Sequence, residues 1–265
     1  MRYLRKNKIK KLKKLDLSKL KESKELLLKE KAKYDLPLTV SQRELKLLAQ
    51  NKPIQHIIGF IDYTDVKIKV NQNVLIPRYE TEELIYLASE IIRSIPHIKQ
   101  PKILDLCTGS GFIGFSLKKK FPQAQVVMTD ISKKALKIAR YNARKNFGKS
   151  FRQIKILHRN LFHRIKGNFD LIIANPPYLD KNDVTVEESV RNNEPLIALF
   201  AAKKGWDIYE KILANSKKYF SNNPYAKLLM EINPLHSNKW QQIIDCKIIK
   251  DINGKNRFVK LDKNY

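Results

Sequence analysis

The sequence is poor in the residues that build cross-linked, metal-bound or membrane-spanning proteins. Its two cysteines, Cys107 and Cys246, have no paired spacing, so we expect a reduced protein without a disulfide or zinc framework. The five histidines show no metal-binding spacing. No apolar run approaches the ~20 residues that span a bilayer, and none follows the basic N-terminus as in a secretory signal. These absences predict a cytoplasmic protein.

Glycine, proline and acidic residues are also scarce. With 8 glycines, 11 prolines and 43% hydrophobic residues, most of the 265-residue chain should fold, either as one large α/β domain with a small appendage or as two modest domains. Only 26 acidic residues oppose 53 lysines and arginines, which gives a net charge of +27. Such a charge is compatible with an anionic partner and with weak nonspecific nucleic-acid binding. The abundance of Lys, Asn and Ile supports equally well a merely compositional origin.

The N-terminal part of the chain predicts a small helical module. Ser41 and Glu44 have the spacing of a capping box at a helix start. Such a basic helix can bind RNA or be a solvated surface helix. The helical spacing of leucines comes from Leu12, Leu15, Leu17, Leu20, Leu26, Leu27 and Leu28.

The period then changes to that of strands. Apolar residues from Ile57 to Ile61, and then Val66, Ile68 and Val70, predict two strands around a turn at residues 62–65. We therefore divide the chain into a helical domain at 1–52, a hairpin linker at 53–76 and a main domain at 77–265.

In the main domain, strands and helices alternate. This order predicts a mostly parallel α/β sheet with right-handed crossovers and an antiparallel edge hairpin. The expected helices are 81–95, 112–120, 132–146 and 205–219, and the expected strands are 102–106, 125–129, 154–157, 169–174, 227–232, 247–252 and 257–261.

A small-residue loop follows the first strand of this domain. Small side chains there let the backbone approach a ligand and expose N–H groups at a helix N-terminus. Asp130, 19 residues after Gly111, can accept both ribose hydroxyls of a nucleoside. The spacing Gly109, Gly111, Gly114 also matches the dinucleotide fingerprint, so a nicotinamide enzyme stays a competitor at this point. The candidate loop residues are Asp105, Cys107, Thr108, Gly109, Ser110 and Gly111.

The tetrapeptide Asn175-Pro176-Pro177-Tyr178 follows the apolar strand at 169–174, at a sheet edge where ligands bind. An amide nitrogen is a weak nucleophile and must be held in line with a methyl donor. The Asn175 side-chain carbonyl can accept one N–H, the backbone carbonyl of Pro176 can accept the other, and Tyr178 can stack on the planar group. A nicotinamide dehydrogenase has no use for this tetrapeptide. The pattern predicts methylation of a planar amide or amino nitrogen.

Further blocks resemble the PrmC/HemK family, the protein-(glutamine-N5) methyltransferases of class I peptide chain release factors. The resemblance covers about residues 50–262, and each block is specific only in combination with the others. The blocks are Pro53 to Gly59, Asn73 to Glu82, Asn175 to Tyr178, Val190 to Leu199 and Asp251 to Arg257.

The resemblance implies a Rossmann-like class I methyltransferase domain that binds S-adenosyl-L-methionine and yields S-adenosyl-L-homocysteine. It implies a monomer that acts in translation termination on the glutamine of a Gly-Gly-Gln motif, gripped by residues 175–178. Arg78 and Thr81 would line the site. The implied cofactor contacts are the loop from Cys107 to Gly111, Asp130, Asn160, Leu161 and Asn175.

Three positions depart from the family pattern. Cys107 replaces the first loop glycine, and its side chain fits if φ is negative there. Asn160 stands in place of Asp, and residues 200–205 replace a glycine-rich turn. Two other functions compete with this one. One is a nucleic-acid methyltransferase acting on adenine N6 or guanine N2, supported by the charge. The other is a non-enzymatic ribosome-binding protein, which the intact Asp130 and tetrapeptide oppose.

Overall fold

The computed structural model describes residues 17–63, 65–243 and 245–265. The predicted helical positions Leu12 and Leu15 lie outside the described residues. The chain forms two compact units, Met1–Gly59 and Phe60–Tyr265. The three-part division expected from the sequence stays a prediction. Within the described residues, no helix combines the length and the apolar character that a membrane crossing requires.

The first unit contains helices α2 (Leu17–Lys33), α3 (Gln42–Leu48) and α4 (Ile54–Ile58). The predicted capping box at α3 is confirmed, because the Glu44 N–H donates to Ser41 Oγ and the Ser41 N–H donates to Glu44 Oε2 at 2.7 Å. Lys31, on α2, forms an ion pair with Glu44 at 2.6 Å. The same carboxylate therefore caps one helix and joins it to another.

The strand predicted to begin at Ile57 was wrong. Residues 54–58 form α4, which ends at Gly59 with φ +90°. A short apolar run does not distinguish strand from helix by periodicity, and here Pro53 and Gly59 bound one helical turn. The hairpin itself is present as β1 (Phe60–Tyr63) and β2 (Val66–Lys69), which pair antiparallel.

The second unit is built on a seven-stranded sheet in the order β5-β4-β3-β6-β7-β9-β8. The first five strands of this order are parallel, and β9 pairs antiparallel with both β7 and β8, as the sequence predicted for the last two strands. The strands are β3 (Lys102–Leu106), β4 (Gln125–Asp130), β5 (Lys155–His158), β6 (Leu171–Ala174), β7 (Lys227–Glu231), β8 (Cys246–Lys250) and β9 (Asn256–Asp262).

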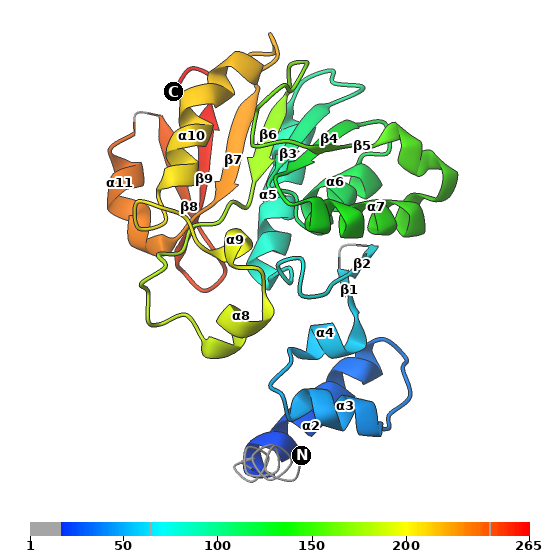
Figure 1. Cartoon of the computed structure of the whole chain (residues 1–265). Coiled ribbons are helices and arrows are strands. Elements are labelled where there is room, and N and C mark those ends of the chain that lie inside the picture. The colour runs from blue at the N-terminus through cyan, green and yellow to red at the C-terminus, as the bar shows by residue number, and fades with distance from the viewer. Residues whose placement is uncertain (1–16, 64, 244) are drawn as a thin grey trace. The chain divides into compact units, whose positions relative to one another are not determined.

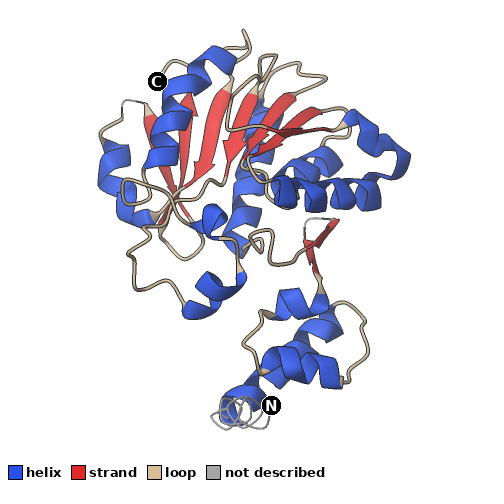
Figure 2. Ribbon diagram, in the orientation of Figure 1, coloured by secondary structure: helices blue, strands red, loops and turns tan. Residues whose placement is uncertain are grey.

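Helices cover both faces of this sheet, so the unit has three layers (Figures 1 and 2). Three short helices that sequence periodicity did not predict, α8, α9 and α11, lie in the connections. The helices are α5 (Tyr79–Ser94), α6 (Phe112–Lys120), α7 (Lys133–Phe147), α8 (Glu188–Asn193), α9 (Leu196–Leu199), α10 (Asp207–Ser216) and α11 (Ser237–Gln241), with 3₁₀ turns η1 (Gly148–Gln153), η2 (Lys217–Tyr219) and η3 (Pro234–His236).

The pleat of β6 divides the interior into two cores. Leu171 and Ile173 pack with residues of α5, α6 and α7 on one face, while Ile172 and Ala174 pack with residues of α10 and α11 on the other. All four residues of β6 are buried, as expected for a central parallel strand covered on both faces. This burial places the end of β6, where the tetrapeptide begins, at the centre of the sheet.

Candidate active site

The candidate site lies where the strand order reverses. From β3 the chain adds β4 and β5 on one side of the sheet. It then crosses to the other side of β3 and adds β6 and β7 there. Ligands of open α/β sheets bind at such a switch point, outside the carboxyl ends of the strands. Here the segments after β3, β4, β5 and β6 line one cavity of about 290 Å³. From the predicted set, this cavity contains Cys107, Gly109, Asp130, Asn160, Leu161, Asn175 and Pro177.

The loop after β3 has a left-handed backbone at alternate positions. Gly109 has φ +54° and Gly111 has φ +92°, so each uses the freedom of glycine. Cys107 has φ +56°, so the condition under which its side chain would fit without strain, a negative φ, is not met. Its Cβ is strained in this region, at a cost of about 1–2 kcal/mol. Position 107 thus keeps the left-handed conformation of the loop, although it has a cysteine where the family pattern has a glycine.

Asp105 supports this loop from beneath. Its fully buried carboxylate accepts from Thr108 Oγ1 at 2.5 Å and from the Gly114 N–H at 3.0 Å. Its other oxygen, Oδ1, has no hydrogen-bond partner within the described part of the chain. Burial raises the pKa of this carboxyl to about 7. A buried, unpartnered carboxylate oxygen is a ready acceptor for a cationic group.

Asp130 ends β4 and faces the same cavity. Its Oδ2 accepts from the Gly109 N–H at 2.8 Å and its Oδ1 accepts from the Ser132 N–H at 2.7 Å. Burial raises the pKa of Asp130, and these two N–H donors oppose that effect. Since each carboxylate oxygen has two lone pairs, acceptor capacity remains for a ligand.

Most remaining residues of the predicted cofactor set border a separate, smaller cavity of about 40 Å³. Thr81, Thr108 and Ser110 line it together with Cys107, Gly109 and Asn175. Asp105 and Gly111 line neither of these two cavities, nor the one beside the tetrapeptide. Any contribution they make is therefore to the shape and charge of the loop.

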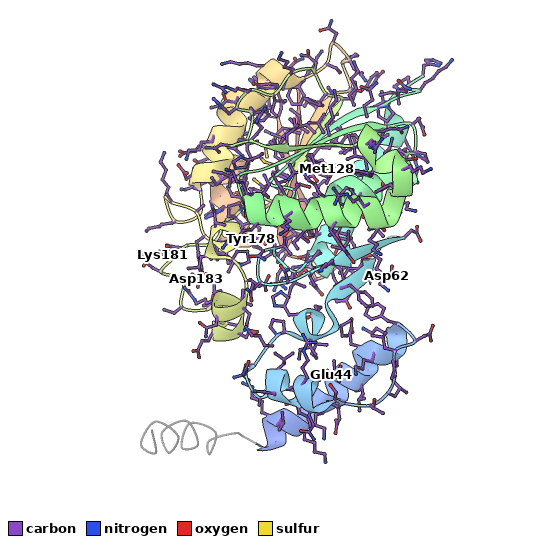
Figure 3. The ribbon with its side chains drawn as sticks, turned by 45° about the vertical axis from the view of Figure 1, so that its right-hand side comes forward. Glu44, Asp62, Met128, Tyr178, Lys181 and Asp183 are labelled. Carbon is purple, nitrogen blue, oxygen red and sulfur yellow. The ribbon has the colours of Figure 1, made fainter. Side chains whose placement is uncertain are left out.

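The tetrapeptide borders a second cavity of about 250 Å³, lined by Asn175, Pro176 and Tyr178 and also by Arg78. The chain then continues toward α8, and Figure 3 labels Tyr178 at the start of this connection and Lys181 and Asp183 farther along it. Val186 and Glu187 from this connection, and Val190 on α8, also line the cavity. Four of the five predicted substrate contacts, all except Pro177, therefore lie here.

Hydrogen bonds determine how Asn175 is oriented. Its Nδ2 donates to Thr81 Oγ1 at 3.2 Å, and Thr81 Oγ1 donates to Glu231 Oε2 at 3.0 Å. Tyr178 donates its hydroxyl to the other oxygen of Glu231 at 2.9 Å. Among the described residues, no hydrogen bond reaches Asn175 Oδ1 or the Pro176 carbonyl. Two acceptors at the tetrapeptide are thus left for a ligand.

Arg78 is held by a buried partner. It forms an ion pair with Glu194, whose other carboxylate oxygen accepts from the Ile76 N–H at 2.9 Å. This contact joins two blocks that are far apart in the sequence. The Arg78 guanidinium keeps part of its surface exposed, so it can also contact a ligand in the second cavity.

Three side chains form a wall shared by the first two cavities: Leu75, Asn175 and Ala198. A ligand in one cavity therefore lies next to a ligand in the other at Asn175. Sequence reasoning singled out Asn175 for both sites but did not single out Leu75 or Ala198. It also missed Glu231, although an acidic residue that ends the apolar strand β7 beside β6 was a detectable signal.

Gly205 packs against the tetrapeptide. A Cβ at this position would lie 2.1 Å from the Tyr178 carbonyl oxygen, and φ is +89°. Nearby, Leu179 and the segment 199–201 exchange backbone hydrogen bonds of 2.9 and 3.1 Å. The altered turn at residues 200–205 thus keeps the one glycine that the close approach requires.

Comparison with known proteins defines the class. A family model described as the methyltransferase small domain matches residues 86–193. A solved methyltransferase from Pyrococcus furiosus has a TM-score of 0.54 at 15% identity and covers 84% of this chain and 99% of its own. The human methyltransferase 10 domain containing protein has a TM-score of 0.52 at 14% identity, covering 76% and 90%. The fold is therefore that of a Rossmann-like α/β methyltransferase.

Curated relatives give the family. A release factor glutamine methyltransferase from Lactococcus lactis is 35% identical over 84% of this chain and 84% of its own length. The one from Streptococcus pneumoniae is 36% identical over 81% and 76%. A bifunctional methyltransferase from Rickettsia bellii is 32% identical over 88% of this chain but only 47% of its own. The chain belongs to the release factor glutamine methyltransferase family.

Proposed function

We propose that this protein transfers a methyl group from S-adenosyl-L-methionine to the side-chain amide N5 of the glutamine in the Gly-Gly-Gln motif of class I release factors. The observation that carries the proposal is the placement of Asn175. Its Oδ1 accepts no hydrogen bond from the described residues, and it stands in the wall shared by the two cavities. The names of the relatives support a protein amide over a nucleobase as the acceptor.

The larger cavity has the hydrogen-bond acceptors that an adenosine-bearing methyl donor needs. Asp130 lines this cavity and can accept from ribose hydroxyls. The buried carboxylate of Asp105 does not line it but supports the loop, and its negative charge would favour an ammonium group bound nearby. Asn160, after β5, can accept from an adenine amino group through its side-chain carbonyl. When bound, the cofactor supplies an electrophilic methyl group, and its product is S-adenosyl-L-homocysteine.

The chain's own contribution is positioning. Asn175 Oδ1 and the Pro176 carbonyl would each accept one N–H of the substrate amide, which aims its nitrogen along a fixed direction. Tyr178 would flank the planar amide, with its hydroxyl anchored on Glu231. Arg78 lines the same cavity and would contact the glutamine-bearing segment. Such orientation can supply up to about 7–11 kcal/mol of a reaction barrier.

A three-arm methyl-transfer assay tests this function. The protein is incubated with labelled S-adenosyl-L-methionine and a class I release factor, or the same factor with its tip glutamine changed to alanine, or total RNA. We expect label only in the first arm. Label in RNA and none in the release factor would favour the nucleic-acid alternative and overturn the proposal.

We further propose that the protein acts as a cytoplasmic monomer in translation termination and binds nucleic acid weakly through its charge. One segment carries a large share of this charge. From 131 to 169 the sequence contains no aspartate or glutamate and twelve lysines and arginines. On α7, exposed cations without an ion pair in the described residues are Lys133, Lys134, Lys137, Arg140, Arg144 and Lys145.

A further inference from the structure

We infer that Glu231 is a positioning residue that sets which end of the Asn175 amide faces the substrate, acting through the hydroxyl of Thr81. The inference rests on the proposed function and deepens it, because it concerns how the site distinguishes an amide from a carboxylate. It starts from the chain of contacts Asn175, Thr81, Glu231 and Tyr178, which joins the ends of β6 and β7 to the first turn of α5.

The first step concerns the single proton of the Thr81 hydroxyl. An ionised carboxylate only accepts hydrogen bonds, and a threonine hydroxyl has one O–H to donate. Thr81 donates it to Glu231 Oε2 at 3.0 Å. In its remaining contact, the Thr81 oxygen can therefore only accept.

The second step concerns the partner in that remaining contact. Of the two ends of the Asn175 amide, only the NH2 group can donate to an accepting oxygen. The Nδ2 atom lies 3.2 Å from Thr81 Oγ1, so the carbonyl oxygen Oδ1 is turned away from Thr81. A substrate glutamine needs an acceptor for its N–H. The Glu231 carboxylate, which is linked to Asn175 through Thr81, thus determines that Asn175 presents an acceptor to the substrate.

The third step concerns Tyr178, which uses the other oxygen of Glu231. Its hydroxyl donates to Oε1 at 2.9 Å. Both oxygens of one carboxylate are occupied by hydroxyl donors, one from the residue that orients Asn175 and one from the tetrapeptide itself. A glutamine at 231 could accept only one of the two hydrogen bonds, since its NH2 end is a donor. The arrangement therefore requires a carboxylate and not merely a polar side chain.

Burial shields the hydrogen bonds of Glu231 and Thr81 from water. Glu231 is 1% exposed and Thr81 is 3% exposed, so little water can replace either hydrogen bond. The charged groups that act on Glu231 are Arg257, on β9, and Glu80, on α5. Arg257 also forms an ion pair with Asp251 at 3.2 Å. Burial raises the pKa of Glu231, while Arg257 and the two hydroxyl donors oppose that rise.

The test is a double-mutant cycle in the full chain with Glu231→Gln and Thr81→Val, which nearly conserve side-chain volume. We expect each single change to lower kcat on the release factor by at least about tenfold, since a hydrogen bond to a buried carboxylate is lost or reversed. The cofactor affinity of Glu231→Gln, measured by calorimetry without release factor, should stay within about twofold, because Glu231 lines neither cavity of the cofactor loop. Thr81→Ser should recover part of the turnover lost in Thr81→Val, because it restores the hydroxyl.

Non-additivity is the decisive readout. If Glu231 acts through Thr81, the double variant should be no slower than the slower single variant. Multiplied losses would show that Glu231 acts independently and would overturn the inference. Loss of cofactor binding in Glu231→Gln would show general damage to the fold and would also overturn it.

A second readout measures the polarity of the site directly. A release factor whose tip glutamine is changed to glutamate offers oxygen acceptors where the amide offers N–H donors. We expect it to inhibit wild type weakly, because Asn175 Oδ1 would repel it, and to inhibit Glu231→Gln at least about fivefold more strongly, because the Asn175 amide can then turn. Unchanged inhibition would contradict the inference. If wild type methylates no release factor at all, the proposed function fails instead.

Discussion

At the scale of the single residue, Asn175 has a position that the sequence predicts and a side-chain orientation that it does not. Its position at the end of a central buried strand follows from the sequence pattern, because the apolar run before it predicts the strand and strand ends meet at one edge of the sheet. The orientation of its amide could not be predicted, because it depends on Thr81, 94 positions away, and on Glu231 beyond it. Local patterns carry no information on such long-range pairings.

Replacing Asn175 by alanine should separate binding from turnover. We expect Asn175→Ala to lower kcat on the release factor by at least about 100-fold, by analogy with the loss of one oriented polar group at a reacting centre. Cofactor affinity should change by less than about twofold, because Asp130 and the loop remain. Calorimetry and steady-state kinetics measure the two quantities, and equal turnover in the variant would contradict the proposed grip.

The unpartnered oxygen of Asp105 predicts a pH dependence of cofactor binding. Burial raises the pKa of this carboxyl to about 7, so in the free protein it is largely neutral below that pH and charged above it. A cationic ammonium group binds the carboxylate better than the neutral acid. Affinity for S-adenosyl-L-methionine should therefore rise with pH through about 7 and fall by up to about tenfold per pH unit below it.

The measurement is calorimetry between pH 5.5 and 7.5, where the ammonium group of the cofactor stays protonated. Asp105→Asn is the matched control, since it keeps the volume and removes the titration. We expect it to bind more weakly and with little change over this range. A wild-type affinity that is flat with pH would rule out this electrostatic role of Asp105.

Cys107 offers a test of stored backbone strain. Its φ of +56° is unfavourable for any residue with a Cβ. Cys107→Gly and Cys107→Ala both remove the thiol, and only alanine keeps the Cβ. We expect the glycine variant to have the larger free energy of unfolding, by about 1 kcal/mol. Chemical denaturation checks the order, and a more stable alanine variant would contradict the strain.

At the scale of elements, the sequence predicted the regular parts well for physical reasons. Long helices with an apolar stripe, such as α5 and α7, and buried strands such as β3 and β6 carry strong periodic signals. The missed helices α8 and α9 have six and four residues, too few to show a period. The start of the first hairpin strand was wrongly placed at Ile57 for the same reason, because α4 has only five residues.

The turn before α10 should control the tetrapeptide through Gly205. In Gly205→Ala the new Cβ would lie 2.1 Å from the Tyr178 carbonyl oxygen, so the backbone of one segment must move. We expect a loss of about 2–3 kcal/mol in stability, from overpacking added to the left-handed backbone, together with reduced turnover.

Gly254→Ala is the matched control for that change. Gly254 has a similar left-handed backbone, with φ +78°, but no atom lies within 4 Å of a Cβ built there. It should therefore show only the backbone cost, about 1–2 kcal/mol, and normal turnover. Equal losses of stability and activity in the two variants would show that contact with Tyr178 is unimportant.

At the scale of the whole molecule, the charge is large but unevenly distributed. The acid-free segment 131–169 includes α7, η1 and the edge strand β5, at the opposite end of the strand order from β8. The sequence alone could count these charges but could not show that α7 presents six of them as exposed side chains. The fold decides that its buried positions are the apolar ones and Asn142.

Neutralising one row of α7 should weaken nucleic-acid binding. We expect a variant with glutamine at Lys133, Lys137, Arg140 and Arg144 to bind single-stranded RNA less tightly, with a log–log salt slope smaller by about 3. The control carries glutamine at Lys217, Lys218, Lys247 and Lys250, four exposed lysines outside that segment, and has the same net charge. Fluorescence anisotropy across a salt series compares them. Equal slopes in both variants would show that only net charge matters.

The wall formed by Leu75, Asn175 and Ala198 has a thermodynamic consequence. Because the same side chains border both cavities, a ligand that orders them on one side has already met part of the entropic cost for the other. Linkage then requires reciprocity: whatever factor bound methyl donor adds to the affinity for release factor, bound release factor adds to the affinity for donor. Under the proposed function, the methyl donor and the release factor therefore belong to a single binding equilibrium, and the affinity of either has a meaning only when the occupancy of the other is stated.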